Sequence, residues 1–405
     1  CNSYDEKSAH PSQQLLRKFP AAPIVDLPSE TSEQDLDLLI SNGYGWLGLV
    51  FVSDFFIRAE CPDPTISLSK CKEIHEIYGL DNGRVLASDG AIIYMDSNDY
   101  QRFKEAYRYD EIFLYDGFCF SLSYLPDSYR AAIKDFYVLK ESAPEGPERI
   151  FAKICVNTAF GASAQKVIRD EYDIFSDGTL DADKRTWQKN IERMNDDDVI
   201  KKQNFRFPFL WGLWTASLSR LTLWEMLKVV GWEKCIYWDT DSCKYEGEKV
   251  PEINEIYNKD IIERCVDRDV VVTNRKGNTV YIGSAEDEHP TVDYGYRRFT
   301  FLHSKCYAAE AWNIAKGCYE IETTIAGVGK KEGAEAMQGD ISNLKDGLYI
   351  KVAGGNKLKY IDRLPFERHE FKRPTVTASF IYMTDRDYLV KQGRPERIDA
   401  EILAE

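Results

Sequence analysis

Two aspartates stand one residue apart in the run YWDTDS, residues 237–242. An apolar strand pattern precedes the run and a second short strand pattern follows it, so we expect a hairpin with Asp239 and Asp241 near its tip. Because side chains alternate along a strand, both carboxylates can face the same way. Two such groups repel each other when held together, and divalent cations are the usual remedy for all-oxygen ligands. The sequence therefore predicts a metal site at this hairpin.

Two other interpretations compete for the same run. An arbitrary DxD is most often a polar hairpin turn. A calcium loop of the EF-hand type would need glycine at its sixth position, where this chain has Lys244. The calcium interpretation therefore fails, and the polar turn stays as the alternative.

A second pattern lies in RIFAKICVNTAFG, residues 149–161. On a helix, Arg149, Lys153, Asn157 and Phe160 stack along one face. Two cations, an amide and an aromatic ring would then line one groove, where a triphosphate and a base could be held. An ordinary amphipathic helix with a solvated basic stripe is the alternative.

A third pattern is YDEKSAHPS, residues 4–12, in which Asp5 ends a strand and enters a turn and a helix. Taken alone, an aspartate before serine and proline is commonly a turn or a helix cap.

Composition limits the class of protein. The chain has 405 residues, 43% of them hydrophobic, and a formal net charge of -15. The length predicts more than one lobe, and the charge argues against a generally cationic nucleic-acid binder, although basic residues cluster locally around residues 140–153, 296–305 and 329–331. Without an apolar run near twenty residues or a signal-peptide pattern, we expect a cytoplasmic protein of a bacterium or phage-infected cell with no membrane contact. The ten cysteines contain no CxxC pair and are expected to be reduced.

Periodicity predicts the main elements. Strands are expected over residues 46–60 and from residue 111, a hairpin around Asp89 and Gly90, and a helix after Ser97. Two antiparallel helices should follow Pro126, and an apolar helix should run from Phe209 to Val230.

Together and in this order, the three patterns resemble motifs A, B and C of family B DNA polymerases. Residues 237–242 match YxDTDS fully. The helix matches KxxxNSxYG at Lys153, Asn157 and Gly161, and the first pattern matches DxxSLYPS at Asp5, Ser8, Pro11 and Ser12. Residues 305–307 look like the KxY element of the same family. The short part after Lys305 is most similar to protein-primed phage polymerases.

The resemblance implies an α+β right hand with an antiparallel-sheet palm, two-helix fingers and a small thumb. Palm segments are expected at residues 1–23, 111–125 and 205–300, fingers at 126–165, and the KxY element and thumb at 301–405. A β-rich insertion resembling the first terminal-protein region is expected at residues 24–110 and a second insertion at 166–204.

The implied activity is template-directed DNA synthesis from dNTPs on primer-template DNA with two Mg²⁺ ions, for which Mn²⁺ is an expected substitute. The resemblance assigns catalysis and metal binding to Asp5, Asp239 and Asp241, with the backbone carbonyl of Glu6 as a further metal contact. It assigns nucleotide binding to Ser8, His10, Lys140, Arg149, Lys153, Asn157, Phe160 and Gly161, and DNA binding to Tyr296, Arg297, Arg298, Lys305 and Tyr307.

Two departures leave alternatives open. His10 stands where the family carries a tyrosine beneath the incoming sugar, so a ribonucleotide-tolerant polymerase or primase is an alternative, as is a non-catalytic DNA-binding scaffold. The family's exonuclease precedes motif A, so we expect this chain to lack that domain. A partner chain could supply it if the gene is split; the chain could instead be truncated, or begin at a splice junction at Cys1. A terminal protein is a further expected partner.

Overall fold

The computed structural model describes residues 1–61, 63–81, 83–164, 208–345 and 348–352, and the backbone of residues 359–364, 367–372 and 379–382. All strand pairings within this part are antiparallel, and helices pack against the sheets. The predicted mixture of helices and antiparallel sheets is confirmed. The second insertion expected at residues 166–204 lies outside the described residues.

A four-stranded sheet brings the start of the chain beside the YWDTDS hairpin. Its order is β10 (Cys235–Asp239), β11 (Ser242–Tyr245), β1 (Asn2–Glu6) and β14 (Ala285–Asp287). One face carries Tyr4, Cys243 and Tyr245, which are buried in the main hydrophobic core. Because side chains alternate, the neighbours of these residues point to the opposite face, and Asp5 is among them.

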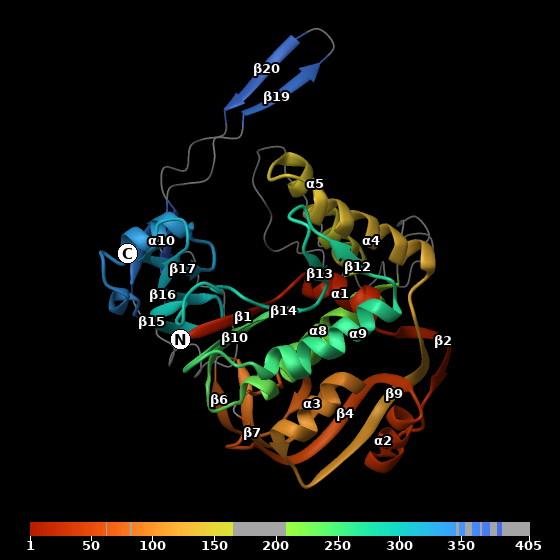
Figure 1. Ribbon diagram of the computed structural model, residues 1–405. Helices are drawn as coiled ribbons and strands as arrows, with labels where there is room; N and C mark the ends of the chain where they lie inside the picture. The colour runs from red at the N-terminus through yellow and green to blue at the C-terminus, as the bar shows by residue number, and fades with distance from the viewer. Residues whose placement is uncertain are drawn as a thin grey trace.

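Helices from separate parts of the chain pack around this sheet (Figure 1). They are α1 (Ala9–Leu16), the pair α4 (Asp127–Ser142) and α5 (Pro147–Ser163), the long α8 (Phe209–Val230), the one-turn π-helix Ile253–Tyr257 and α9 (Asn258–Asp267). The predicted apolar helix is confirmed as α8, which Gly231 ends with φ 93°. Gly212 brings α8 close to the end of α5, because a Cβ there would lie 2.6 Å from the Ser163 carbonyl oxygen.

A larger sheet forms the lower body in Figure 1. Its order is β2 (Phe19–Asp26), β9 (Glu111–Ser123), β4 (Tyr44–Ile57), β7 (Arg84–Asp96) and β5 (Cys71–Ile74), with β3 (Thr31–Ser32), β6 (Ile77–Asp81) and β8 (Tyr107–Arg108) paired at the sides. Helices α2 (Glu33–Ser41) and α3 (Ser97–Ala106) and the 3-10 turn Leu68–Lys70 belong to it.

Two expectations change in this region. The hairpin predicted at Asp89 and Gly90 is wrong, because β7 runs unbroken through both and Gly90 pairs with Ser53 of β4. A long partner strand stabilises the extended backbone here despite the turn-like dipeptide. The expected boundary between residues 110 and 111 falls inside one sheet, since β9 lies between β2 and β4.

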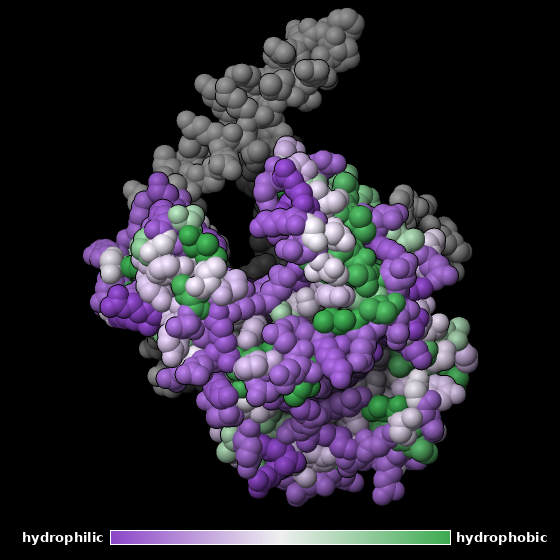
Figure 2. Space-filling model, viewed as in Figure 1, coloured by the Kyte–Doolittle hydropathy of each residue, from purple (hydrophilic) through white to green (hydrophobic). Residues whose placement is uncertain are grey.

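A third group of strands follows the four-stranded sheet in the chain. It contains β15 (Tyr296–His303), β16 (Cys306–Asn313) and β17 (Cys318–Ile325), then α10 (Lys330–Ala336) and the 3-10 turn Ile341–Asn343. Further pairs are β12 (Val271–Thr273) with β13 (Thr279–Tyr281), β18 (Tyr349–Val352) with β21 (Ser379–Tyr382), and β19 (Lys359–Leu364) with β20 (Glu367–Lys372). Figure 2 shows the surface hollowed between the β15–β17 lobe and the α4–α5 pair.

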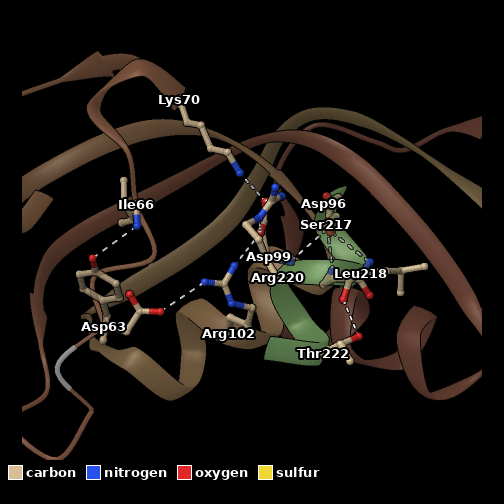
Figure 3. A network of polar contacts seen from close by, with 12 residues as sticks. Asp63, Ile66, Lys70, Asp96, Asp99, Arg102, Ser217, Leu218, Arg220 and Thr222 are labelled. Atoms are coloured by element: carbon tan, nitrogen blue, oxygen red, sulfur yellow. Dashed lines mark hydrogen bonds and ion pairs between the residues drawn. The ribbon is translucent and has the colours of Figure 1, made fainter. Parts of the chain in front are cut away.

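Buried ion pairs join the larger sheet to α8 (Figure 3). Asp99 of α3 accepts from Arg220 of α8 at 2.8 and 3.0 Å, from Arg102 at 3.2 Å, and from Lys70. Asp96 caps α3 by accepting from the backbone of Asn98 and Asp99, and also accepts from Ser217 of α8 at 2.6 Å. We call Asp96, Asp99, Arg102, Arg220 and Lys70 the ionic cluster. It joins α3 and the larger sheet to α8, which also packs against the four-stranded sheet.

No helix in the described part of the chain is long and apolar enough to cross a membrane. All ten cysteines are free thiols, and Cys61, Cys243, Cys265 and Cys306 are buried.

Candidate active site

Three aspartates meet at one end of the four-stranded sheet. Asp5 of β1 lies opposite Ser242 of β11, and Ser242 in turn lies opposite Asp239 of β10. The hairpin tip is formed by Thr240, in the left-handed region at φ 59°, and Asp241. The Glu6 backbone N–H donates to the Asp241 carbonyl oxygen at 2.7 Å. The structure thus brings residue 5 beside the pair at the hairpin, as the sequence predicted.

The charges at this end of the sheet are not balanced. Burial raises the pKa of Asp5 to about 7, and the nearby Asp241 carboxylate acts in the same direction. Burial and then Asp239 raise the pKa of Asp241. The Lys305 ammonium stands 4.0 Å from Asp239. We call Asp5, Asp239 and Asp241 the acidic cluster; desolvated and mutually repelling carboxylates favour the binding of cations.

Glu6 is placed differently from the other acids. Its carboxylate points into the core, where one oxygen accepts from Ser12 Oγ at 2.9 Å and from Gln13 Nε2 at 3.2 Å, and the other has no hydrogen-bond partner among the described residues. Burial raises the pKa of Glu6 to about 8. Its side chain therefore does not join the acidic cluster.

No group of three or more His, Cys, Asp or Glu side chains within the described ranges is arranged to hold a metal ion. The acidic cluster brings carboxylates together without forming a finished set of ligands. The donors are nevertheless all oxygen, which is the chemistry that Mg²⁺ prefers.

The predicted nucleotide-binding residues lie on α5, α4 and the start of α1. On α5, Lys153 and Asn157 are exposed, and Arg149 forms an ion pair with Glu145. The open side of Gly161 has no atom within 4 Å of a hypothetical Cβ.

Two contacts tie these helices to the segment after Asp5. The His10 and Phe160 rings lie 4.2 Å apart, so the first and second motifs touch. Lys140 Nζ donates to Ser8 Oγ at 3.0 Å, and Ser8 is left-handed at φ 57°. Burial lowers the pKa of Lys140, and Arg220 adds to burial in lowering the pKa of His10. A ring pair and a lysine thus join the segment after Asp5 to the α4–α5 pair.

The predicted DNA-binding residues fall into two groups. Arg297 and Lys305 are exposed, and Lys305, left-handed at φ 58°, donates its backbone N–H to Tyr237 Oη at 2.9 Å. Tyr296, however, is only 4% exposed, and Arg298 is held by Glu310 and Asp340 at 3.1 and 3.0 Å. Tyr296 therefore offers no surface to a ligand in this structure, because its side chain fills the joint between two sheets.

Sequence reasoning missed two acids next to the site. Glu286 of β14 lies opposite Asp5, and Glu288 accepts from Ser3 Oγ; both raise the pKa of Asp5. The sequence feature that could have indicated them is the run of three acids in AEDE, residues 285–288. It could not be used because nothing in the sequence shows that this segment pairs with β1.

Comparison with known proteins gives likeness in structure alone. No protein-family profile matches the chain, and no curated protein matches it in sequence. Among solved structures, phi29 DNA polymerase with primer-template DNA and incoming nucleotide matches with a TM-score of 0.59 and 15% identity, over 95% of this chain and 57% of that one. The same polymerase with single-stranded DNA matches with a TM-score of 0.58 and 15% identity, again over 95% and 57% of the two chains.

The chain has a DNA-polymerase-like fold. At 15% identity the likeness establishes this fold, and the finer family assignment stays a prediction. The chain spans about 57% of the length of the phi29 polymerase.

Proposed function

We propose that the chain catalyses template-directed DNA synthesis, in which a primer 3′-hydroxyl attacks the α-phosphate of a dNTP and releases pyrophosphate. The observation that carries the proposal is the acidic cluster, in which Asp5 stands next to the hairpin of Asp239 and Asp241 although Asp5 is far from that hairpin in sequence. The polymerase-like fold supports it, and neighbours of that fold are complexes with primer-template DNA.

Asp5, Asp239 and Asp241 would hold Mg²⁺. When bound, the metal would favour the ionised primer hydroxyl and the leaving pyrophosphate. The residues fit such ions by charge, because burial and mutual repulsion raise the pKa values of Asp5 and Asp241. A cation would relieve this repulsion and restore the ionised carboxylates.

The chain's own cations would orient the nucleotide. Lys153 is exposed on α5, and Arg149 lies one turn before it. Both can bind triphosphate oxygens and offset negative charge that grows during phosphoryl transfer. Lys140, tied to Ser8, is a further cation at the base of the same helices. The charge of these side chains therefore favours a nucleoside triphosphate as substrate.

Primer extension with Mg²⁺ tests the proposal. Asp241→Asn should reduce extension by at least about 10³-fold while the protein still binds primer-template DNA. Asp127→Asn is the matched control, because Asp127 is 94% exposed and pairs with Arg130 at the surface. Equal extension by wild type and Asp241→Asn would reject the assignment. Absence of extension in the wild type, with intact DNA binding, would favour a DNA-binding protein without catalysis.

A second candidate is a polymerase that tolerates ribonucleotides. The contact between the tilted His10 and Phe160 rings supports it, because an imidazole is smaller than the tyrosine expected beneath the sugar. Comparing kcat/KM for dCTP and CTP, in wild type and His10→Tyr, separates the candidates. Strong preference for dCTP in both proteins would exclude relaxed sugar selection, whereas preference gained only in His10→Tyr would support it.

A further inference from the structure

Lys244 is a buried cation on the same sheet as the acidic cluster. It lies on β11 opposite Ser3 of β1 and Tyr237 of β10, and its side chain is 3% exposed. Lysine is almost never buried unless it is paired. The Lys244 ammonium is therefore expected to have partners within the fold.

Each contact of the Lys244 ammonium reaches another part of the fold. It donates to Glu288 Oε2 and to Tyr296 Oη, both at 3.1 Å. It also lies 4.8 Å from the centre of the Tyr296 ring and 5.6 Å from that of Tyr307. Glu288 follows β14, whereas the two tyrosines belong to β15 and β16. The Lys244 ammonium therefore joins the four-stranded sheet to the β15–β17 lobe.

The contacts continue from Tyr307 to the acidic cluster. The Tyr307 and Tyr237 rings lie 5.2 Å apart, and the Tyr237 hydroxyl accepts from the Lys305 backbone N–H at 2.9 Å. The Lys305 side chain is exposed and reaches to 4.0 Å from Asp239. The position of Lys305 near Asp239 therefore depends on the Tyr237 ring, which packs against the Tyr307 ring that Lys244 contacts.

We propose that Lys244 is a positioning residue for the primer strand. By holding the Tyr296 and Tyr307 rings against the four-stranded sheet, it sets where the turn that carries Lys305 meets DNA. This inference rests on the proposed function in one respect, which is that the bound DNA strand is a primer. Lys244 itself touches no solvent-facing site, so it acts through the rings and through Lys305.

The matched comparison is Lys244→Met against Lys249→Met. Lys249 also pairs with an acid of β14, Asp287, at 2.7 Å, and its Nζ donates to the His289 carbonyl oxygen, but no contact joins it to the tyrosine rings in the described part of the chain. Both substitutions remove one lysine charge and one ion pair. They differ in whether the rings of the β15–β17 lobe lose their partner.

The experiment measures the Kd for a fluorescent primer-template in Ca²⁺ without nucleotide, the KM for dNTP in Mg²⁺, and the melting temperature. Lys244→Met should raise the Kd about tenfold, the loss expected for a desolvated cation–ring contact. It should leave the KM for dNTP within about twofold, and Lys249→Met should change neither.

Two results would overturn the inference: a folded Lys244→Met protein with an unchanged Kd, or equal weakening by both substitutions. If Lys244→Met does not melt cooperatively, Lys244→Gln replaces it, because an amide can still donate to Glu288 and Tyr296 while lacking the charge. The Kd does not require catalysis. A wild type that binds DNA without extending it therefore removes the proposed function and leaves this inference testable.

Discussion

The ionic cluster and the acidic cluster both hold aspartates away from water, and their charges are balanced in opposite ways. Asp99 is surrounded by Arg220, Lys70 and Arg102, which together hold its pKa below the ordinary value although burial acts to raise it. Asp5 has other carboxylates around it, and its pKa is raised to about 7. The first arrangement is complete within the chain and serves stability. In the second, no ion pair within the described residues neutralises Asp5 or Asp241, and unbalanced carboxylates of this kind are typical of a site that binds cations.

The largest expected effect is on activity. Asp5→Asn should lower primer extension by at least about 10³-fold, because it removes a proposed metal ligand from the acidic cluster. The same change should leave the melting temperature equal or raise it, since it removes repulsion with Asp241. Primer extension and thermal melting of one preparation measure both. A large loss of stability would show that Asp5 has a structural role like that of Asp99.

The next effect is on stability. Asp99→Asn leaves the half-buried Arg220 and the buried Arg102 without their shared carboxylate and should lower the free energy of unfolding by about 3–5 kcal/mol. Urea denaturation measures the change. Asp127→Asn removes only an exposed pair with Arg130 and should cost less than about 1 kcal/mol. A cost for Asp99→Asn as small as that of the control would contradict the contrast between the two clusters.

The smallest effect is on pH dependence. The ordinary pKa of an aspartate, 3.8, is raised to about 7 in folded Asp5, so between these values the folded protein holds a proton that the unfolded chain has released. The part of stability that Asp5 controls should therefore fall as the pH rises through this window and stay level above it. Melting temperatures at the two ends of the window should differ by about 2–4 °C more in wild type than in Asp5→Asn. Added Mg²⁺ should reduce this additional difference in melting temperature. An identical pH dependence of wild type and Asp5→Asn would show that Asp5 is ionised throughout the window.

Local patterns predicted the elements that local forces determine. The helix Phe209–Val230 and the strand Glu111–Ser123 have the bounds expected from apolar periodicity and Gly231. The Asp89 and Gly90 hairpin was wrong because the dipeptide is compatible with a turn, and hydrogen bonds to the neighbouring segments on both sides keep it extended. Which strands are neighbours was decided by contacts distant in sequence.

The same division holds for the site. Asp239 and Asp241 were found because they are close in sequence, and Asp5 because its surroundings resemble a known motif. Glu286 and Glu288 were missed since they enter the site only through the pairing of β14 with β1. The burial of Tyr296 could not be foreseen for a similar reason: its partner Lys244 lies on a strand of another sheet.

Three residues that are not glycine turn the backbone left-handed around the acidic cluster: Ser8, Thr240 and Lys305, with φ of 57°, 59° and 58°. This conformation costs roughly 1–2 kcal/mol for a residue with a Cβ, and threonine, branched at that atom, tolerates it poorly. Each of the three is a corner where the chain reverses or leaves a strand, and each carries a hydroxyl or an ammonium that glycine would lack. The protein therefore spends some of its stability on keeping functional groups at these corners. Glycine at position 240 would relax the backbone but would remove the hydroxyl that donates to Asp239.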